Sequence, residues 1–210
     1  MTAKEIFDRV KKYGNSVETT ICYLHKPQGN SCCLDEKYKC SKISQKSVLD
    51  FDEITKEFCK KQGINPYSST DALSYKTDSL LFIEIKGWRQ FIKYHSPLTK
   101  DSILKQEEKY NLNKKLEDSI SVCKKIINPN AFVTDDKIVY VLVIDTEVKQ
   151  QDARVQLLQN LNILAYDSSS IYITISEITK THLQQSVKRP IRKIRVFCQN
   201  FDKTLNYNII

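Results

Sequence analysis

The chain has 210 residues, of which 40% are hydrophobic, and this composition suits one globular domain with its own core. Lysine and arginine outnumber aspartate and glutamate by 33 to 25, and the net charge of +8 favours a polyanionic partner such as a nucleic acid. Four glycines leave no glycine-rich phosphate loop, and the lack of a membrane-length apolar stretch or a secretion signal predicts a cytoplasmic protein.

Two amphipathic helices are predicted in the first third of the chain. Residues 3–13 carry apolar side chains at helical spacing. Residues 52–62 repeat this pattern, with Asp50 or Asp52 as the N-cap and Gly63 at the end. Each helix has one apolar face, so both are expected to pack on the core.

The segment between these helices is rich in cysteine and less regular. Residues 17–24 are rich in β-branched and aromatic side chains and predict a strand, and residues 31–43 suit a short hairpin. Seven cysteines without a secretion signal indicate reduced thiols. A structural zinc site is the alternative, although the spacing of its candidate ligands fits no tight knuckle pair; these are Cys22, His25, Cys32, Cys33 and Cys40.

A β-hairpin follows, with strands at residues 70–75 and 80–86 and a polar turn between them. A short turn places Asp71 opposite Glu84, and directly opposed side chains lie about 5 Å apart on one face. Two carboxylates at that distance repel each other unless a cation or a proton lies between them. Because Lys86 shares this face, the sequence predicts a divalent-metal site with a neighbouring ammonium group.

At Asp71 and the triplet Glu84-Ile85-Lys86 the chain resembles the PD-(D/E)xK nuclease superfamily, in which an Asp at the start of one strand precedes Glu-x-Lys on the next. The resemblance implies an α/β fold with a restriction-endonuclease-like core, a mixed β-sheet flanked by helices. It also implies that Asp71, Glu84 and the Ile85 carbonyl bind one or two Mg²⁺ or Mn²⁺ ions, and that Lys86 orients water or stabilises transition-state charge. The strand that usually precedes the Asp-bearing one is sought in residues 31–43.

The same resemblance suggests accessory residues. Gln106 and Tyr110 match the Gln-x-x-x-Tyr element of RecB-like members. An additional glutamate on an early helix often completes the metal site in this superfamily, and Glu57 is the candidate here, unless it simply faces water. Three further glutamates are alternatives to it: Glu5, Glu18 and Glu53.

The segment after the hairpin mixes aromatic and cationic residues. Trp88, Phe91 and Ile92 are expected to pack on the sheet. Arg89 and Lys93 are candidate nucleic-acid contacts, because interleaved aromatic and basic side chains bind bases and phosphates, or else they are solvated.

A long helix and a buried strand are predicted next. The helix covers residues 99–127, and Thr99 or Asp101 is its N-cap. Its lysine-rich face either follows a phosphate backbone or keeps the helix in water. Residues 137–145 form a nearly continuous β-branched run, which is typical of a strand buried on both faces. Strand, helix and strand in this order predict a parallel βαβ unit.

The C-terminal part is predicted to extend the sheet. We expect a helix at residues 152–161 and strands at 161–165 and 170–176. A dense basic segment follows, which is either a phosphate-contacting edge or a solvated tail. It carries Lys188, Arg189, Arg192, Lys193 and Arg195.

These observations predict a single nuclease-like domain over residues 1–210. Residues 1–47 are a candidate N-terminal appendage, 48–145 the core with the site, and 146–210 a C-terminal extension. The leading hypothesis is a metal-dependent endonuclease or exonuclease that hydrolyses phosphodiester bonds, in DNA rather than RNA. The alternatives are an inactive nuclease-like module that binds nucleic acid or protein, and a solvated sheet face on which Lys86 is only a salt bridge. A homodimer or another protein partner is left open.

Overall fold

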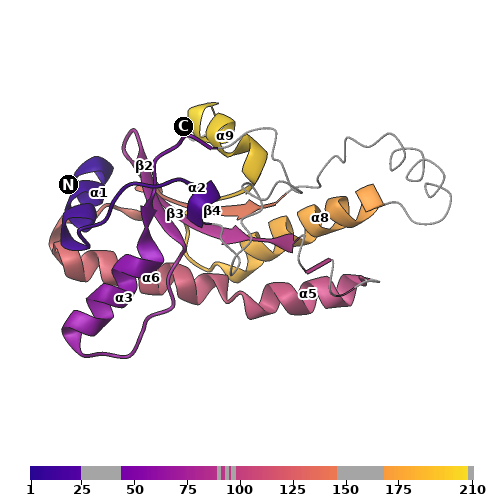
Figure 1. The fold of residues 1–210 in the computed structure, drawn as a ribbon, viewed down its shortest axis with the longest axis horizontal. Helices are drawn as coiled ribbons and strands as arrows, with labels where there is room; N and C mark the ends of the chain where they lie inside the picture. The colour runs from indigo at the N-terminus through magenta and orange to yellow at the C-terminus, as the bar shows by residue number, and fades with distance from the viewer. Residues whose placement is uncertain (25–43, 89–90, 93–94, 96–97, 146–167, 208–210) are drawn as a thin grey trace.

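The computed structural model describes residues 1–24, 44–88, 91–92, 95, 98–145 and 168–207. Within these ranges the chain forms a mixed α/β fold around one five-stranded sheet, in the order β1-β2-β3-β4-β5 (Figure 1). The strands β1, β2 and β3 are antiparallel, whereas β4 runs parallel to β3 and β5 parallel to β4. Their bounds are Leu49–Asp50, Ala72–Lys76, Ser79–Lys86, Ile138–Ile144 and Arg192–Phe197.

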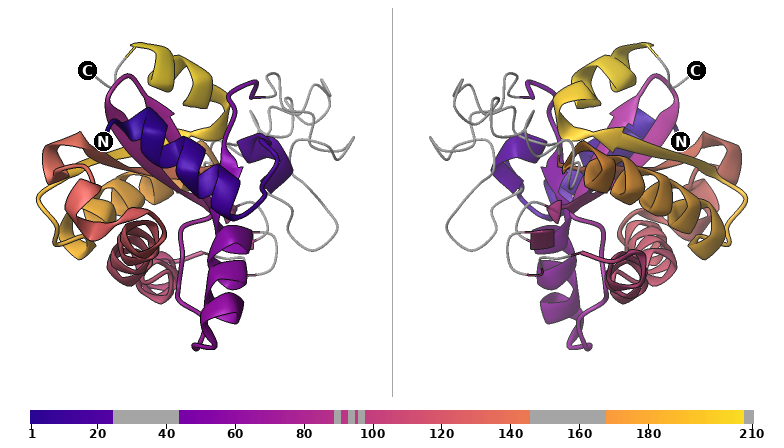
Figure 2. Two further views of the ribbon diagram at one scale, coloured as in Figure 1. Left: turned by 90° about the vertical axis from the view of Figure 1, so that its left-hand side faces the viewer. Right: turned by 90° about the vertical axis from the view of Figure 1, so that its right-hand side faces the viewer.

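Helices cover both faces of the sheet. One face packs against α1, α3, α5, α6 and α8, and the other against α2 and α9, as Figures 1 and 2 show. The helices are α1 (Ala3–Tyr13), α2 (Ile21–Leu24), α3 (Phe51–Gln62), α5 (Lys100–Lys109), α6 (Leu112–Ile127), α8 (Ser168–Ser186) and α9 (Phe201–Tyr207). Short 3₁₀ helices lie at Pro129–Ala131, Asp135–Lys137 and Cys198–Asn200.

The hairpin has the predicted register. Leu73 pairs with Phe82 and Tyr75 with Leu80 across β2 and β3. The positive φ of 50° at Thr77 lets the two-residue turn close. Phe82 therefore faces the core shared with α3 and α6, and Ile83 faces the core shared with α2 and α9.

Local capping explains where the first helices start and stop. Thr2 and Glu5 form a reciprocal capping box at the start of α1. The Asp50 side chain caps α3, and Gly63 ends it in the left-handed conformation at φ 64°. The predicted helices at 3–13 and 52–62 are confirmed, and so is the strand predicted at 137–145, which is β4 and is buried along its whole length.

Two predicted strands are wrong. Residues 21–24 form the helix α2, and only Thr19 makes an isolated bridge, to Val48. Residues 170–176 lie inside α8, because Ile175, Ile178 and Leu183 are buried at helical spacing against the sheet. Packing of that apolar stripe outweighs the strand preference of its β-branched residues.

The predicted helix over 99–127 is also wrong as one element. It breaks between α5 and α6 at Asn111, which adopts a left-handed φ of 50°. Thr99 caps α5 as predicted. In the described part of the chain, the strand that pairs with β2 ahead of Asp71 is β1, at Leu49–Asp50.

Several predictions fall outside the described residues. These are the hairpin at 31–43, the helix at 152–161, the strand at 161–165, the contacts of Arg89 and Lys93, and the zinc ligands His25, Cys32, Cys33 and Cys40. The remaining zinc candidate, Cys22, is buried and accepts a hydrogen bond from the Ser44 amide at 3.3 Å.

Candidate active site

Glu84 on β3 is the centre of a charged cluster on the sheet face that α6 covers. Its side chain is fully buried. One oxygen, Oε1, accepts a hydrogen bond from Lys115 Nζ at 2.7 Å and also binds Lys86 Nζ. The other oxygen, Oε2, has no hydrogen-bond partner in the described part of the chain. A buried carboxylate oxygen without a partner is costly, so this atom is a natural place for a ligand.

Asp71 approaches Glu84 from the residue before β2. Its Oδ2 accepts a hydrogen bond from the Ile85 amide at 2.6 Å, and its Oδ1 lies 4.0 Å from Lys115 Nζ. The Asp71 side chain is 32% exposed, whereas that of Glu84 is fully buried. Asp71, Glu84 and Lys86 are thus brought together as the hairpin register implies, with one carboxylate open to solvent.

The protonation of Glu84 depends on its burial and on the charges beside it. Burial raises the pKa of Glu84 above its ordinary value of 4.5, and the charge of Asp71 adds to this increase. Lys86 and Lys115 oppose it. Burial also disfavours the charge on Lys115, but the attraction of Glu84 and Asp71 outweighs it and raises the Lys115 pKa. Within the cluster, the charges of Glu84 and Lys115 therefore affect each other.

Tyr110, at the end of α5, contacts the cluster through Lys86. The Lys86 ammonium lies 4.7 Å from the centre of the Tyr110 ring, a cation–π distance. Burial raises the pKa of the Tyr110 hydroxyl, and the neighbouring Gln106 side chain opposes that rise. The structure therefore places Gln106 beside Tyr110, and Tyr110 beside Lys86.

Lys115 is the site residue that the sequence interpretation missed. Lys115 reaches Glu84 because α6 packs against the residues just before Asp71. There the Thr70 amide donates to Ser119 Oγ at 2.9 Å. A signal was present, because Lys115 follows Leu112 by three residues and precedes Ser119 by four, which places it on the buried stripe of α6.

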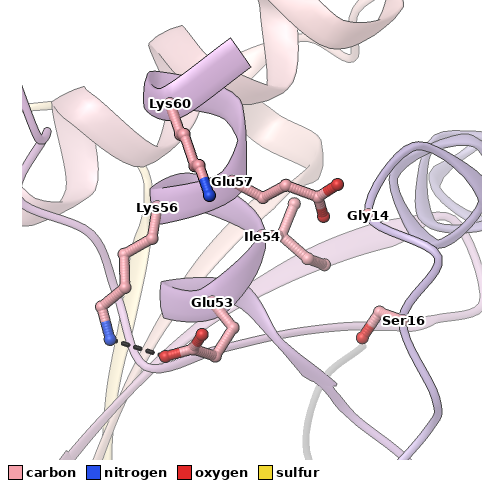
Figure 3. A pocket seen from close by; sticks show the side chains of 7 residues that line it. All are labelled: Gly14, Ser16, Glu53, Ile54, Lys56, Glu57 and Lys60. Carbon is pink, nitrogen blue, oxygen red and sulfur yellow. Dashed lines mark hydrogen bonds and ion pairs between the residues drawn. The ribbon is translucent and has the colours of Figure 1, made fainter. Parts of the chain in front are cut away.

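Glu57, the predicted accessory glutamate, is not brought to the cluster. It pairs with Lys61 at 2.6 Å and borders a surface hollow of about 470 Å³ beside Gly14 and Ser16 (Figure 3). Among the acids of α3, Asp52 is the one that interacts electrostatically with Lys115, and it also accepts a hydrogen bond from Ser69 Oγ at 2.8 Å.

The basic C-terminal segment is not a solvated tail, because it forms the edge strand β5 and the turn before it. Arg189 is held by Glu117 and Asp135, at 2.8 and 2.9 Å. Lys193 Nζ donates to the Val187 carbonyl at 2.6 Å, and Arg195 is half-buried over the Phe197 ring. Lys188 and Arg192 remain at the exposed surface of this edge.

Replacing Lys115 with Met should lower the free energy of unfolding by about 2 kcal/mol, because Glu84 loses a charged hydrogen-bond donor. The raised pKa means that the folded protein holds the Glu84 proton more tightly than the unfolded chain does. The Glu84 contribution to stability is therefore greatest below pH 4.5 and falls as the pH rises to the raised pKa. Without Lys115 the pKa of Glu84 should rise further, so in the variant this loss of stability should continue to higher pH.

Urea unfolding at a series of pH values measures both effects. Lys114→Met is the matched control, because Lys114 is exposed and its one ion-pair partner among the described residues is Asp118, one turn along α6 at 2.7 Å. Such surface pairs contribute well under about 1 kcal/mol. Equal losses in the two variants would contradict a special role for Lys115.

Comparisons with known proteins found no match among family models, curated proteins or solved structures. No described helix is long and apolar enough to span a membrane. Among the described residues, no three His, Cys, Asp or Glu side chains are grouped as a metal site. Asp71 and Glu84 are a pair of acids, and any ion that they bind must complete its shell with backbone oxygen, water or substrate.

Proposed function

We propose that this protein is a metal-dependent nuclease of the PD-(D/E)xK kind, acting on phosphodiester bonds with DNA as the expected substrate. The observation that carries the proposal is the convergence of Asp71, Glu84 and Lys86 across the β2–β3 hairpin. Two carboxylates can hold a divalent ion that activates water, and an ammonium group beside them can balance charge on the phosphate.

The topology supports this proposal. The hairpin is followed by the helices α5 and α6 and then by β4, which pairs in parallel with β3. This is the order of hairpin, helix and central strand that a restriction-endonuclease-like core requires. The short strand β1 supplies the antiparallel neighbour of β2 on the other side.

The donor set fits Mg²⁺ or Mn²⁺. Asp71 Oδ1, Glu84 Oε2 and the Ile85 carbonyl would supply oxygen ligands, which these ions prefer, and Glu84 Oε2 has no hydrogen-bond partner in the described chain. When bound, such an ion polarises the scissile phosphate and lowers the pKa of a bound water.

The remaining groups act on charge and position. The Lys86 ammonium, 15% exposed at the edge of the cluster, can hold the attacking water or balance charge on the phosphate. Lys115 pairs with Glu84 and opposes the rise of its pKa, which favours the ionised carboxylate that a metal ion would bind. Exposed cations such as Lys188 and Arg192 are suited to phosphate contacts away from the cleaved bond.

Cleavage assays on supercoiled plasmid, linear duplex, single-stranded DNA and RNA test the proposal. We expect cleavage with Mg²⁺ or Mn²⁺ and complete loss in excess chelator, because the two carboxylates alone cannot activate water. Restoring the ion should restore activity. Cleavage that persists unchanged in chelator would contradict the mechanism, and comparing plasmid with linear DNA separates endonuclease from exonuclease activity.

One observation favours an inactive binding module as the second candidate. Both Lys86 and Lys115 lie against the same oxygen of Glu84, as they would in a permanent salt-bridge network. Such a module would bind nucleic acid or a protein partner with this fold but would not turn over substrate. The two candidates predict different behaviour for Lys86, as described below.

A further inference from the structure

A second buried acid lies outside the charged cluster. Glu107 on α5 is fully buried, and its Oε2 accepts a hydrogen bond from His182 Nδ1 on α8 at 2.9 Å. Its other oxygen has no hydrogen-bond partner in the described chain. Removing the one partner of a buried carboxylate is costly, so the contact between these two helices depends strongly on this pair.

This pair is connected to Tyr110 through the last turn of α5. The Tyr110 amide donates to the Glu107 carbonyl at 3.0 Å. Beyond Tyr110 the chain turns at Asn111, so this end of α5 is not continued into α6. The direction of the Tyr110 ring is therefore set by how α5 sits on α8.

The Tyr110 ring in turn packs on two residues near the candidate active site. It meets Trp88 edge-on, with ring centres 5.9 Å apart, and it lies under the Lys86 ammonium. Trp88 is fully buried, and its backbone amide donates to Asp145 at 2.7 Å, so that side of the contact is fixed. Movement of α5 would displace Tyr110 from Lys86, not Trp88 from the core.

We propose that Glu107 and His182 are positioning residues, which fix α5 on α8 and thereby hold Tyr110 against Lys86. The inference deepens the proposed function, because it identifies what keeps the Lys86 ammonium in one orientation. The contact itself is measurable without any activity. Lys86 methylene protons near the Tyr110 ring face should show an upfield ring-current shift, and the emission of Trp88, the single tryptophan, reports the packing around it.

Two replacements of His182 separate positioning from general packing. His182→Asn keeps an amide donor close to the place of Nδ1, whereas His182→Leu keeps bulk and removes the donor. We expect His182→Leu to lose the Lys86 ring-current shift, to change Trp88 emission and to lower single-turnover cleavage about 10- to 100-fold with little change in KM. His182→Asn should retain most of all three properties.

A Lys86 shift that persists in folded His182→Leu overturns the inference. If His182→Leu does not fold, His182→Gln takes its place. The glutamine amide lies farther from the backbone than the Nδ1 atom of histidine, so it leaves the Nδ1 position empty. If the wild-type protein cleaves no substrate and His182→Leu still loses the Lys86 shift, the positioning role is supported and the proposed nuclease function is contradicted. Equal effects of His182→Asn and His182→Leu would show that packing, not the hydrogen bond, matters, and would also overturn the inference.

Discussion

Glu84→Gln should lower the single-turnover rate of metal-dependent cleavage by at least about a thousandfold, because it removes a charged oxygen ligand of the ion. Substrate binding should stay the same or become tighter, since the lost charge repels phosphate. The fold should persist, because the amide oxygen of Gln still accepts from Lys115, which lies 2.7 Å from Oε1. Filter binding and single-turnover cleavage on one preparation measure the two effects separately.

Glu108→Gln is the matched control for this substitution. This substitution makes the same chemical change at Glu108, on the exposed face of α5, and it should leave the cleavage rate unchanged. A Glu84→Gln enzyme that retains more than about a tenth of the wild-type rate would exclude Glu84 as a metal ligand.

Lys86→Met should reduce the single-turnover rate by about a hundredfold and leave the affinity for substrate nearly unchanged, because the ammonium acts on a water or on transition-state charge. Methionine keeps an apolar stem over the Tyr110 ring, so the packing there is preserved. Arg192→Ala on the exposed edge of β5 should behave in the opposite way. It should weaken binding at low salt and lower the salt slope by about one unit, with saturated turnover unaffected.

The binding-module hypothesis predicts a different result for Lys86→Met. In that case Lys86 only forms an ion pair with Glu84. Replacing it would change the stability of the protein, or would weaken nucleic-acid binding as Arg192→Ala does. There would be no cleavage rate to change. Measuring binding at several salt concentrations beside single-turnover cleavage distinguishes the two hypotheses. An unchanged cleavage rate in folded Lys86→Met would remove Lys86 from the catalytic machinery.

The sequence predicted the parts of the fold that depend on local pattern. The alternation of Phe82, Glu84 and Lys86 with apolar residues set the faces of β3, and the polar turn at Thr77 set its register with β2. These features are local because a one-residue slip would turn the apolar side chains out of the core. The caps of α3 and the continuous apolar run of β4 were predictable for the same reason.

The parts that the sequence did not predict depend on distant contacts. Lys115 is one lysine among several on α6 until Leu112 and Ser119 are known to be buried. Arg189 belongs to a basic run until the fold brings it to Glu117 and Asp135. In α8, alternating β-branched residues resemble a strand, and only packing on the sheet selects the helix.

The position of β4 bears on how the protein emerges from the ribosome. β4 is apolar throughout and pairs with β3 on one edge and with Arg192–Phe197 on the other. Its second edge therefore stays uncovered until Arg192–Phe197 has been synthesised. Chains that terminate before Arg192 would expose an unpaired apolar strand, the kind of edge that recruits other chains into aggregates. The basic strand β5 thus protects the apolar strand β4 as well as extending the sheet.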